Sequence, residues 1–307
     1  MDFSVLIACA NKMGCTVTEQ APMREHTTFK VGGPADLLID IPTPEAAAAV
    51  IGCCNRENIP WMFIGNGSNL VVGDKGIRGA VLRMSEQNAQ PVLQPELGEG
   101  YLYAPAGMSL QRLCLFARDN NLTGLEFAFG IPGTVGGAVY MNAGAYDGEM
   151  ANVVKLAHCV TPTGETGMLP VEELDMGYRH TALMEQGYIV TGVTLQLKPG
   201  DRDVIWDRMK ELMNRRRDKQ PLEYPSAGSF FKRPTGYFAG ALIQEAGLKG
   251  FQVGGAQVSE KHAGFVINRG GATAADLTEL CRQVQERIYE KDGVRLEPEV
   301  RFVGEFE

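Results

Sequence analysis

The chain has 307 residues, more than one hydrophobic core usually serves, so two or three subdomains are expected. A net charge of −8 excludes a nucleic-acid binder that relies on a broad basic face. The seven scattered cysteines, without a Cys-x-x-Cys pair, favour reduced thiols in a cytoplasmic protein over a disulfide framework or a zinc site.

Strand and helix patterns alternate in the first third of the chain. Residues 1–10 form an apolar run too short for a membrane span and without the basic start of a signal peptide, so we expect an amphipathic helix and no export. Residues 36–41 predict a strand. Thr43 and Pro44 then suit the cap and first turn of an alanine-rich helix, and residues 61–64 predict a short buried strand.

A glycine-rich loop follows at residues 65–69, with the sequence Gly-Asn-Gly-Ser-Asn. It lacks the Gly-x-Gly-x-x-Gly spacing of a dinucleotide fingerprint, and residues 70–72 after it are strand-like rather than helical. Two interpretations stay open. A hairpin turn, for which Asn-Gly is a strong signal, is slightly favoured. The alternative is an anion-binding nest of successive N–H groups, to which Ser68 and Asn69 add side-chain donors.

The stretch at residues 130–146 is the most unusual part of the sequence, because it holds five glycines, one proline and no charge. Glycine permits positive φ and lets backbone N–H groups approach a ligand, as the cradling of a pyrophosphate requires. A tight turn followed by a small-residue helix packed closely against a neighbour explains the same composition equally well.

A boundary is expected within residues 85–100, where polar residues, proline and glycine accumulate. A strand at residues 101–104 and a helix capped by Ser109 follow. Residues 153–160 and 188–197 then predict strands.

Between these strands, Arg179 lies beside Tyr178 and His180. A loop arginine is usually a solvated surface charge, but this one could meet a carboxylate if its loop faces a cleft. After a second boundary at residues 199–200, residues 201–219 predict a charged helix that ends in Arg215, Arg216 and Arg217. These arginines complement the helix dipole and could also attract a diphosphate.

Ser229 stands between Gly228 and a pair of phenylalanines, and without further context it is expected to be a buried, hydrogen-bonded serine. His262 is expected to be structural, because no second histidine or carboxylate has metal-ligand spacing. Residues 273–292 predict the clearest helix, capped by Thr273 and ended by Gly293. A last strand is expected at residues 300–303.

Taken together, the ordered motifs resemble those of the UDP-N-acetylenolpyruvoylglucosamine reductases over nearly the whole chain, in the shorter class that lacks a substrate-covering tyrosine loop. They are Lys30-Val-Gly-Gly-Pro-Ala35, Gly65-Asn-Gly-Ser-Asn69, Gly130-Ile-Pro-Gly-Thr-Val-Gly-Gly-Ala138, Asn142-Ala-Gly-Ala-Tyr146, Tyr178-Arg179, Gly228-Ser229, His262-Ala-Gly-Phe265 and Glu297-Pro-Glu-Val-Arg301.

The resemblance implies an α+β flavoprotein with an FAD-binding fold of the vanillyl-alcohol-oxidase (PCMH) type, which uses no Rossmann fingerprint. Two FAD-binding subdomains would occupy residues 1–85 and 86–200, and a C-terminal α+β substrate-binding subdomain residues 201–307. The residues implied for non-covalent FAD binding are Val31, Gly32, Gly33, Pro34, Gly65, Asn66, Gly67, Ser68, Asn69, Leu70, Gly130, Ile131, Pro132, Gly133, Thr134, Gly136, Gly137, Ala138, Asn142, Gly144, Ala145 and Tyr146.

The implied activity is the NADPH-dependent reduction of UDP-N-acetylglucosamine enolpyruvate to UDP-N-acetylmuramate for peptidoglycan synthesis. In this scheme Ser229 protonates C2 of the substrate, Arg179 stabilises the enolate-like intermediate, and Glu299 assists by holding or sharing a proton. Glu297 remains the alternative to Glu299. Implied substrate contacts are Tyr178, Arg215, Arg217, Lys219, Lys232, Tyr237, Gln257, His262 and Asn268.

The expected partners are therefore two small-molecule substrates, NADPH and the UDP-sugar. The protein is expected to be a cytoplasmic monomer that binds no metal, nucleic acid or membrane. Two rival functions are kept. A flavin-dependent oxidase of the same fold would consume oxygen and have no need for Ser229. A non-enzymatic flavin- or nucleotide-sugar-binding protein would tolerate loss of Ser229 and Glu299.

Overall fold

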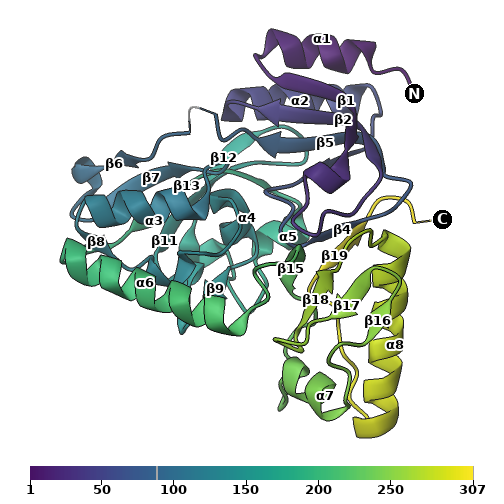
Figure 1. Cartoon of the computed structure of the whole chain (residues 1–307). Coiled ribbons are helices and arrows are strands. Elements are labelled where there is room, and N and C mark those ends of the chain that lie inside the picture. Colours follow the sequence, from purple (N-terminus) through teal and green to yellow (C-terminus); the bar gives the residue numbers. More distant parts are fainter. Residues whose placement is uncertain (88, 307) are drawn as a thin grey trace. The chain divides into compact units, whose positions relative to one another are not determined.

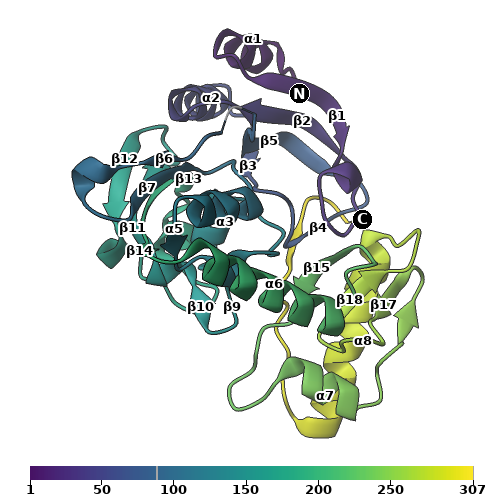
Figure 2. The same ribbon diagram turned by 60° about the vertical axis from the view of Figure 1, so that its left-hand side comes forward.

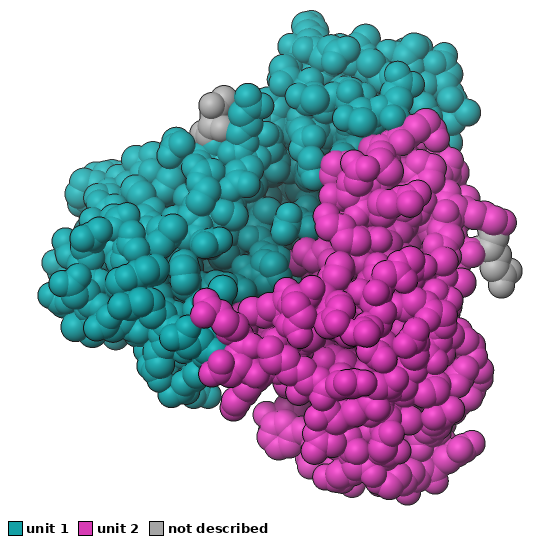
Figure 3. All heavy atoms as spheres, viewed as in Figure 1, with its two compact units in different colours: residues 1–19, 37–66, 79–215 teal, residues 20–36, 67–78, 216–307 magenta. Residues whose placement is uncertain are grey.

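The computed structural model describes residues 1–87 and 89–306 and divides into two compact units, coloured separately in Figure 3. Unit 1 comprises residues 1–19, 37–66 and 79–215, and unit 2 comprises residues 20–36, 67–78 and 216–307. Each unit has its own hydrophobic core. Residues 88 and 307, which the predicted second and third subdomains include, lie outside the described residues. The three-subdomain division stays a prediction.

The N-terminal part of the chain builds a four-stranded sheet of order β1-β2-β5-β3, in which β3 pairs with β5 in parallel. Helix α2 begins where the sequence predicts, because Pro44 is its first residue and the Thr43 hydroxyl accepts the N–H of Ala46 at 3.2 Å. Figures 1 and 2 show α1 alongside α2. The elements are α1 (Ser4–Lys12), β1 (Thr16–Pro22), β2 (Pro34–Ile41), α2 (Pro44–Arg56), β3 (Trp61–Phe63) and β5 (Ile77–Met84).

The rest of unit 1 is organised by a five-stranded antiparallel sheet of order β12-β11-β13-β7-β6. Its central strands β11 (Val154–Val160) and β13 (Ile189–Gln196) confirm the two predicted strands. Ser109 occupies the N-cap position of α3, as predicted, but its side chain makes no capping hydrogen bond. The other elements are β6 (Val92–Leu93), β7 (Tyr101–Pro105), α3 (Leu110–Asp119), β8 (Leu122–Thr123), α4 (Val135–Tyr140), β9 (Gly144–Ala145), β10 (Gly148–Glu149), β12 (Thr166–Pro170), α5 (Ala182–Gln186), β14 (Lys198–Pro199) and α6 (Arg202–Lys219). The last turn of α6, from residue 216 on, belongs to unit 2.

Unit 2 contains a four-stranded antiparallel sheet of order β15-β18-β17-β16 and a parallel pair of β4 with β19. Its core places Phe29 edge-on to Phe230, with ring centroids 6.2 Å apart. A segment near the N-terminus therefore shares a core with the last third of the chain. The elements are β4 (Leu70–Val72), β15 (Ser226–Ser229), α7 (Ala239–Glu245), β16 (Gln252–Val253), β17 (Ala256–Val258), β18 (Phe265–Asn268), α8 (Ala274–Asp292) and β19 (Arg301–Val303).

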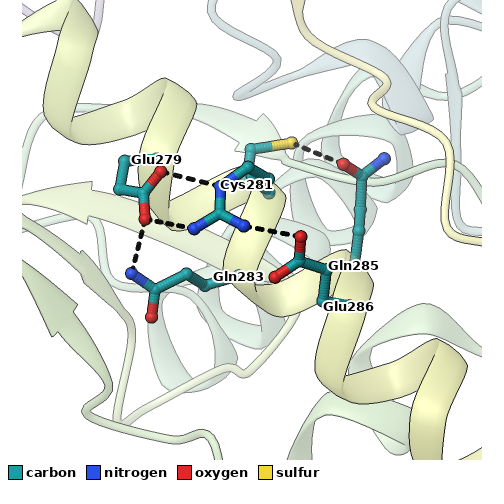
Figure 4. A network of polar contacts seen from close by, with 6 residues as sticks. Glu279, Cys281, Gln283, Gln285 and Glu286 are labelled. Atoms are coloured by element: carbon teal, nitrogen blue, oxygen red, sulfur yellow. Dashed lines mark hydrogen bonds and ion pairs between the residues drawn. The ribbon is translucent and has the colours of Figure 1, made fainter.

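Helix α8 confirms its predicted ends. Thr273 and Asp276 form a capping box, and Gly293 ends the helix in the left-handed conformation. Figure 4 shows polar contacts along this helix: the Arg282 guanidinium bonds Glu279 and Glu286, and the Cys281 thiol donates to Gln285. The arginine–glutamate pairs, three and four residues apart, stabilise the exposed side of the helix.

Short 3-10 turns connect several of these elements, at Met23–Glu25, Pro95–Leu97, Glu126–Ala128, Met150–Asn152 and Val171–Glu173. Within the described part of the chain, none of the helices combines the length and the apolar composition needed to cross a bilayer.

Candidate active site

The loop at residues 65–69 is not a hairpin turn, which corrects the slightly favoured interpretation. Strand β3 before it pairs with β5, and strand β4 after it pairs with β19. Gly67 has φ +62°, and a Cβ at this position would lie 2.2 Å from the carbonyl oxygen of His26. Glycine is therefore required here both by the left-handed backbone and by the close approach of residue 26.

The same loop presents a row of available donors. Among the described residues, no backbone N–H from residues 65–69 is donated to a protein acceptor. The N–H of Thr28 donates to the carbonyl oxygen of Gly67 at 3.3 Å, while the Thr28 hydroxyl is buried without a hydrogen-bond partner. Successive N–H groups and an orphaned hydroxyl suit the oxygens of a phosphate or pyrophosphate group. The donor set therefore fits a dinucleotide such as FAD.

A backbone hydrogen bond in unit 2 holds Glu299 beside the residue that follows Ser229. The N–H of Glu299 donates to the carbonyl oxygen of Phe230 at 2.8 Å, directly after Ser229 at the end of β15. Ser229 is exposed, so the expectation of a buried serine is wrong. The buried Phe230 and Phe231 beside it hold the strand in place and leave the hydroxyl accessible.

The glycine-rich loop is also tied to this part of unit 2. The Asn69 side-chain amide donates to the carbonyl oxygen of Glu299 at 3.0 Å, and the N–H of Arg301 donates to the carbonyl oxygen of Asn69 at 2.9 Å. The loop with the available donors, the exposed serine and the half-buried Glu299 are thus parts of one hydrogen-bonded assembly.

The two candidate carboxylates have different neighbours. Glu297 is exposed, and its carboxylate lies 3.2 Å from the ammonium group of Lys232. The backbone repeats this pairing, because the N–H of Lys232 donates to the carbonyl oxygen of Glu297. Both Glu297 and Lys232 are therefore engaged in a surface ion pair, whereas the backbone of Glu299 is bonded to Phe230, the residue after Ser229.

The glycine-rich stretch at residues 130–146 donates many of its N–H groups to acceptors within the protein. The N–H groups of Val135 and Gly136 donate to residues 108 and 106, and the Thr134 hydroxyl caps helix α4 by accepting the N–H of Gly137. A Cβ on Gly136 would lie 2.7 Å from the Cβ of Ala106. These contacts match the turn and small-residue helix that the sequence left open. Cofactor binding by this stretch stays a prediction.

Asn142, one of the predicted cofactor residues, is 1% exposed and holds its surroundings together. Its amide nitrogen donates to the carbonyl oxygen of Gly177, and its amide oxygen accepts the N–H of Ala151. The first contact anchors the turn that carries Tyr178 and Arg179.

Arg179 occupies a strained position in that turn. Gly177 and His180 exchange backbone hydrogen bonds of 3.0 and 3.2 Å, which makes Tyr178 and Arg179 the central residues of a tight two-residue turn. Arg179 has φ +54°, in the left-handed region that arginine rarely adopts. Strain of this kind persists where the surrounding structure imposes it and is concentrated at functional sites. The guanidinium also lies over the Tyr178 ring, 5.1 Å from its centre.

The remaining predicted substrate contacts have mixed surroundings. Arg215 pairs with Glu211 one turn earlier on α6, as expected of a solvated helix face. Arg217, Lys219 and Tyr237 are exposed. Gln257 and Asn268 are buried and hydrogen bond to the backbone, so both support the fold of unit 2.

His262 supports the strand beside Ser229. Its Nδ1 accepts the N–H of Gly264 at 3.1 Å, and its ring packs edge-on against Phe265, the residue opposite Ser229 in the sheet. Burial lowers the pKa of His262, so the imidazole is kept neutral.

A pocket of about 610 Å³ lies within unit 2 and is lined by three of the predicted cofactor residues, Val31, Gly32 and Gly33. The basic residues Arg24, Lys30 and Arg269 line it as well. Arg24 and Arg269 were not singled out from the sequence, and neither was Thr28. The only feature of the sequence that could have pointed to these three residues is that each lies near a family motif. The described residues contain no group of His, Cys, Asp or Glu side chains arranged to hold a metal ion.

Comparison with known proteins first defines the class. A model of an FAD-binding domain matches residues 35–167, a region that contains both helices and strands, so the chain has an α+β fold with an FAD-binding domain. The family model for the C-terminal domain of UDP-N-acetylenolpyruvoylglucosamine reductase matches residues 220–303, in unit 2.

Full-length relatives identify the family. UDP-N-acetylenolpyruvoylglucosamine reductase from Lachnoclostridium phytofermentans is 51% identical over 94% of this chain and 93% of its own, and that from Clostridium perfringens is 48% identical over the same shares. The crystal structure of the reductase from Thermus caldophilus superposes with a TM-score of 0.79 at 37% identity, covering 94% of this chain and 98% of the other. The chain therefore belongs to the UDP-N-acetylenolpyruvoylglucosamine reductase family and is an FAD-dependent oxidoreductase.

Proposed function

We propose that the chain reduces UDP-N-acetylglucosamine enolpyruvate to UDP-N-acetylmuramate with NADPH as the electron donor. The observation that carries this proposal is the assembly of the donor-rich loop at residues 65–69 with Ser229 and Glu299, in a chain whose family members are named for this substrate. FAD, when bound, supplies the hydride-transfer chemistry that links NADPH to C3 of the enolpyruvyl group.

The protein's own groups would act on the other carbon and on the developing charge. Ser229 is proposed to donate its hydroxyl proton to C2, for which an exposed hydroxyl is needed. A serine hydroxyl is a weak acid, so it can serve only a strongly basic, carbanion-like centre. Arg179 is proposed to stabilise the negative charge on the carboxylate side of the substrate, and Glu299 to hold or share a proton there.

We also propose that the enzyme works as a cytoplasmic monomer. Its seven cysteines are all unpaired thiols, which suits a reducing compartment. Sedimentation of the purified flavoprotein tests the monomer: a mass near 33.3 kDa plus one FAD supports it, and twice that mass contradicts it.

The decisive experiment separates the two half-reactions. The purified protein should show an oxidised-flavin absorption band, NADPH should bleach it, and the enolpyruvyl substrate should restore it. Ser229→Ala should leave the bleaching intact and lower substrate-dependent turnover at least a thousandfold, because only the second half-reaction needs the proton. Ser226→Ala, on the same strand β15, is the matched control and should keep nearly full turnover.

Each rival function predicts a different pattern. An oxidase would restore its flavin band with oxygen alone and tolerate Ser229→Ala. A binding protein would take up FAD without consuming NADPH when the substrate is added. Reoxidation by the substrate at an unchanged rate in Ser229→Ala would overturn the assigned role of this serine.

A further inference from the structure

Two cysteines on neighbouring helices of unit 1 reach toward each other's backbone. The thiol of Cys9 on α1 donates to the carbonyl oxygen of Ala49 on α2 at 3.8 Å. The thiol of Cys53 on α2 donates to the carbonyl oxygen of Val5 on α1 at 4.0 Å. Neither residue belongs to the proposed site, and the contacts run in both directions between the helices that lie side by side in Figures 1 and 2.

The positions of the two acceptors show that the sulfurs lie at the same level of the helix pair. In an α-helix the carbonyl oxygen of residue i−4 accepts the N–H of residue i. Ala49 stands four residues before Cys53, and Val5 stands four residues before Cys9. Each sulfur thus lies beside the peptide group that is hydrogen bonded to the other cysteine. Because helical side chains lean toward the helix N-terminus, this reciprocal arrangement brings both sulfurs to the same level of the contact.

The two thiols differ in access. Cys53 is 1% exposed, whereas Cys9 is half-buried and can meet a small oxidant from solvent. Burial raises the thiol pKa of Cys53, and it raises those of the nearby buried Cys15 and Cys54 to about 11 and about 12. Cys9 is therefore the thiol that a small oxidant meets first. Cys53 is the buried thiol on the neighbouring helix.

A metal site does not explain this cluster. The described residues contain no group of three or more cysteine, histidine or carboxylate side chains placed to hold an ion. What the geometry provides is a pair of thiols in contact with each other across two packed helices.

We propose that Cys9 and Cys53 are a modification site, at which a disulfide oxidant such as oxidised glutathione forms a reversible disulfide joining α1 to α2. The sulfur of Cys9, its proton lost to solvent, attacks one sulfur of oxidised glutathione. A bond to Cys9 forms, the glutathione disulfide breaks, and one glutathione leaves as the thiolate.

The sulfur of Cys53 then attacks the sulfur of Cys9, losing its proton, and the second glutathione leaves. Overall, two cysteine thiols are oxidised by two electrons and one glutathione disulfide is reduced to two thiols. The cross-link closes residues 9–53 into a loop and restricts the unfolded chain, so the oxidised protein is more stable than the reduced protein.

The test treats the FAD-loaded, full-length protein with oxidised glutathione, traps the remaining thiols with N-ethylmaleimide, and maps the cysteines by mass spectrometry. The expected result is one linked pair, Cys9 with Cys53, and five alkylated cysteines. The midpoint of thermal unfolding should rise by about 5 °C and return to its starting value with dithiothreitol. Turnover should be unchanged, because neither helix carries a residue of the proposed site.

Single variants assign the order of the steps. Cys53→Ala should stop at a stable glutathione adduct on Cys9, whereas Cys9→Ala should form neither adduct nor disulfide. Cys15→Ala and Cys54→Ala are matched controls and should still form the Cys9–Cys53 link. A Cys9–Cys15 or Cys53–Cys54 link, a persistent adduct on wild-type Cys9, or full alkylation after oxidation would each overturn the proposal. Mapping the wild-type protein decides the matter even if a variant fails to fold.

Discussion

Glu297 and Glu299 are separated by a single proline, yet the structure gives them different neighbours. Lys232 neutralises Glu297 at the surface, while the backbone of Glu299 is bonded to Phe230, beside the exposed Ser229. The sequence could not choose between them on physical grounds, because both carboxylates precede the last strand. The choice depends on a register set by bonds to residues 230 and 232.

Replacing the two glutamates in turn tests this difference. Glu299→Gln should lower turnover with the enolpyruvyl substrate about a hundredfold or more, since it removes the group proposed to hold or share a proton in the second half-reaction. Glu297→Gln keeps the shape and loses only an exposed ion pair, so turnover should stay within about twofold. Stopped-flow flavin reoxidation measures both. Equal losses in the two variants would contradict the assignment of Glu299.

Gly67 is the residue on which the donor-rich loop depends most. Gly67→Ala should impair FAD retention, because the new Cβ meets the carbonyl oxygen of His26 and the loop must shift. Gly247→Ala is the matched control, since Gly247 has φ +72° in the same unit but no atom within 4 Å of the place where a Cβ would lie. The control should lose about 1 kcal/mol of stability from backbone strain and keep its flavin. Flavin fluorescence after gel filtration reports retention. Similar retention in both variants would show that strain, not the clash, matters.

Helix α8 shows how a segment from the N-terminal third fixes an element of the C-terminal third. The Asp74 carboxylate accepts the N–H groups of Ala274 and Ala275 at 2.8 and 3.0 Å, in the first turn of α8. Thr273 and Asp276 cap the same turn. A negative charge at a helix N-terminus also complements the helix dipole. The first turn of α8 is thus capped both by its own residues and by a carboxylate that is distant in sequence.

Asp74→Ala should therefore loosen the first turn of α8. The loss of a capping carboxylate costs about 1–2 kcal/mol, so the amides of Ala274 and Ala275 should exchange with solvent roughly tenfold faster or more. Glu279→Ala removes an exposed side chain from the network in Figure 4 and should leave those amides unchanged. Hydrogen exchange with mass spectrometry measures the effect. Unchanged exchange in Asp74→Ala would show that the capping box suffices.

Elements with a strong local signal could be predicted, and those decided by distant pairing could not. The caps of α2 and α8 follow from Thr43 and Thr273, whose hydroxyls bond within their own helices. The loop at residues 65–69 misled the prediction because Asn-Gly is typical of hairpins, whereas strand β4 pairs with β19 from the far end of the chain. Thr28 gave no warning because its orphaned hydroxyl is visible only once the loop packs on it.

The whole molecule shows the same limit of local information. Residues 20–36 and 67–78 belong to unit 2 together with the C-terminal third, and the core there includes Phe29 and Val71. A prediction made in chain order divides the sequence into consecutive subdomains. It has no means of showing that two early segments share a core with the C-terminal third. This matters for the site, because residues 67–69 of the donor-rich loop belong to the same unit as Ser229 and Glu299.

Two half-buried histidines, one in each unit, predict how the stability of the molecule depends on pH. Burial lowers the pKa of His158, which packs edge-on against Tyr103, and that of His262 beside Phe265. The unfolded chain therefore binds these protons more readily, so the stabilisation is present above the ordinary pKa of 6.5 and is lost as the pH falls below it. The urea midpoint of the FAD-saturated protein should decrease from pH 7.5 to 5.5. The double variant His158→Gln, His262→Gln should show a shallower slope, and an equal slope would assign the effect to other groups.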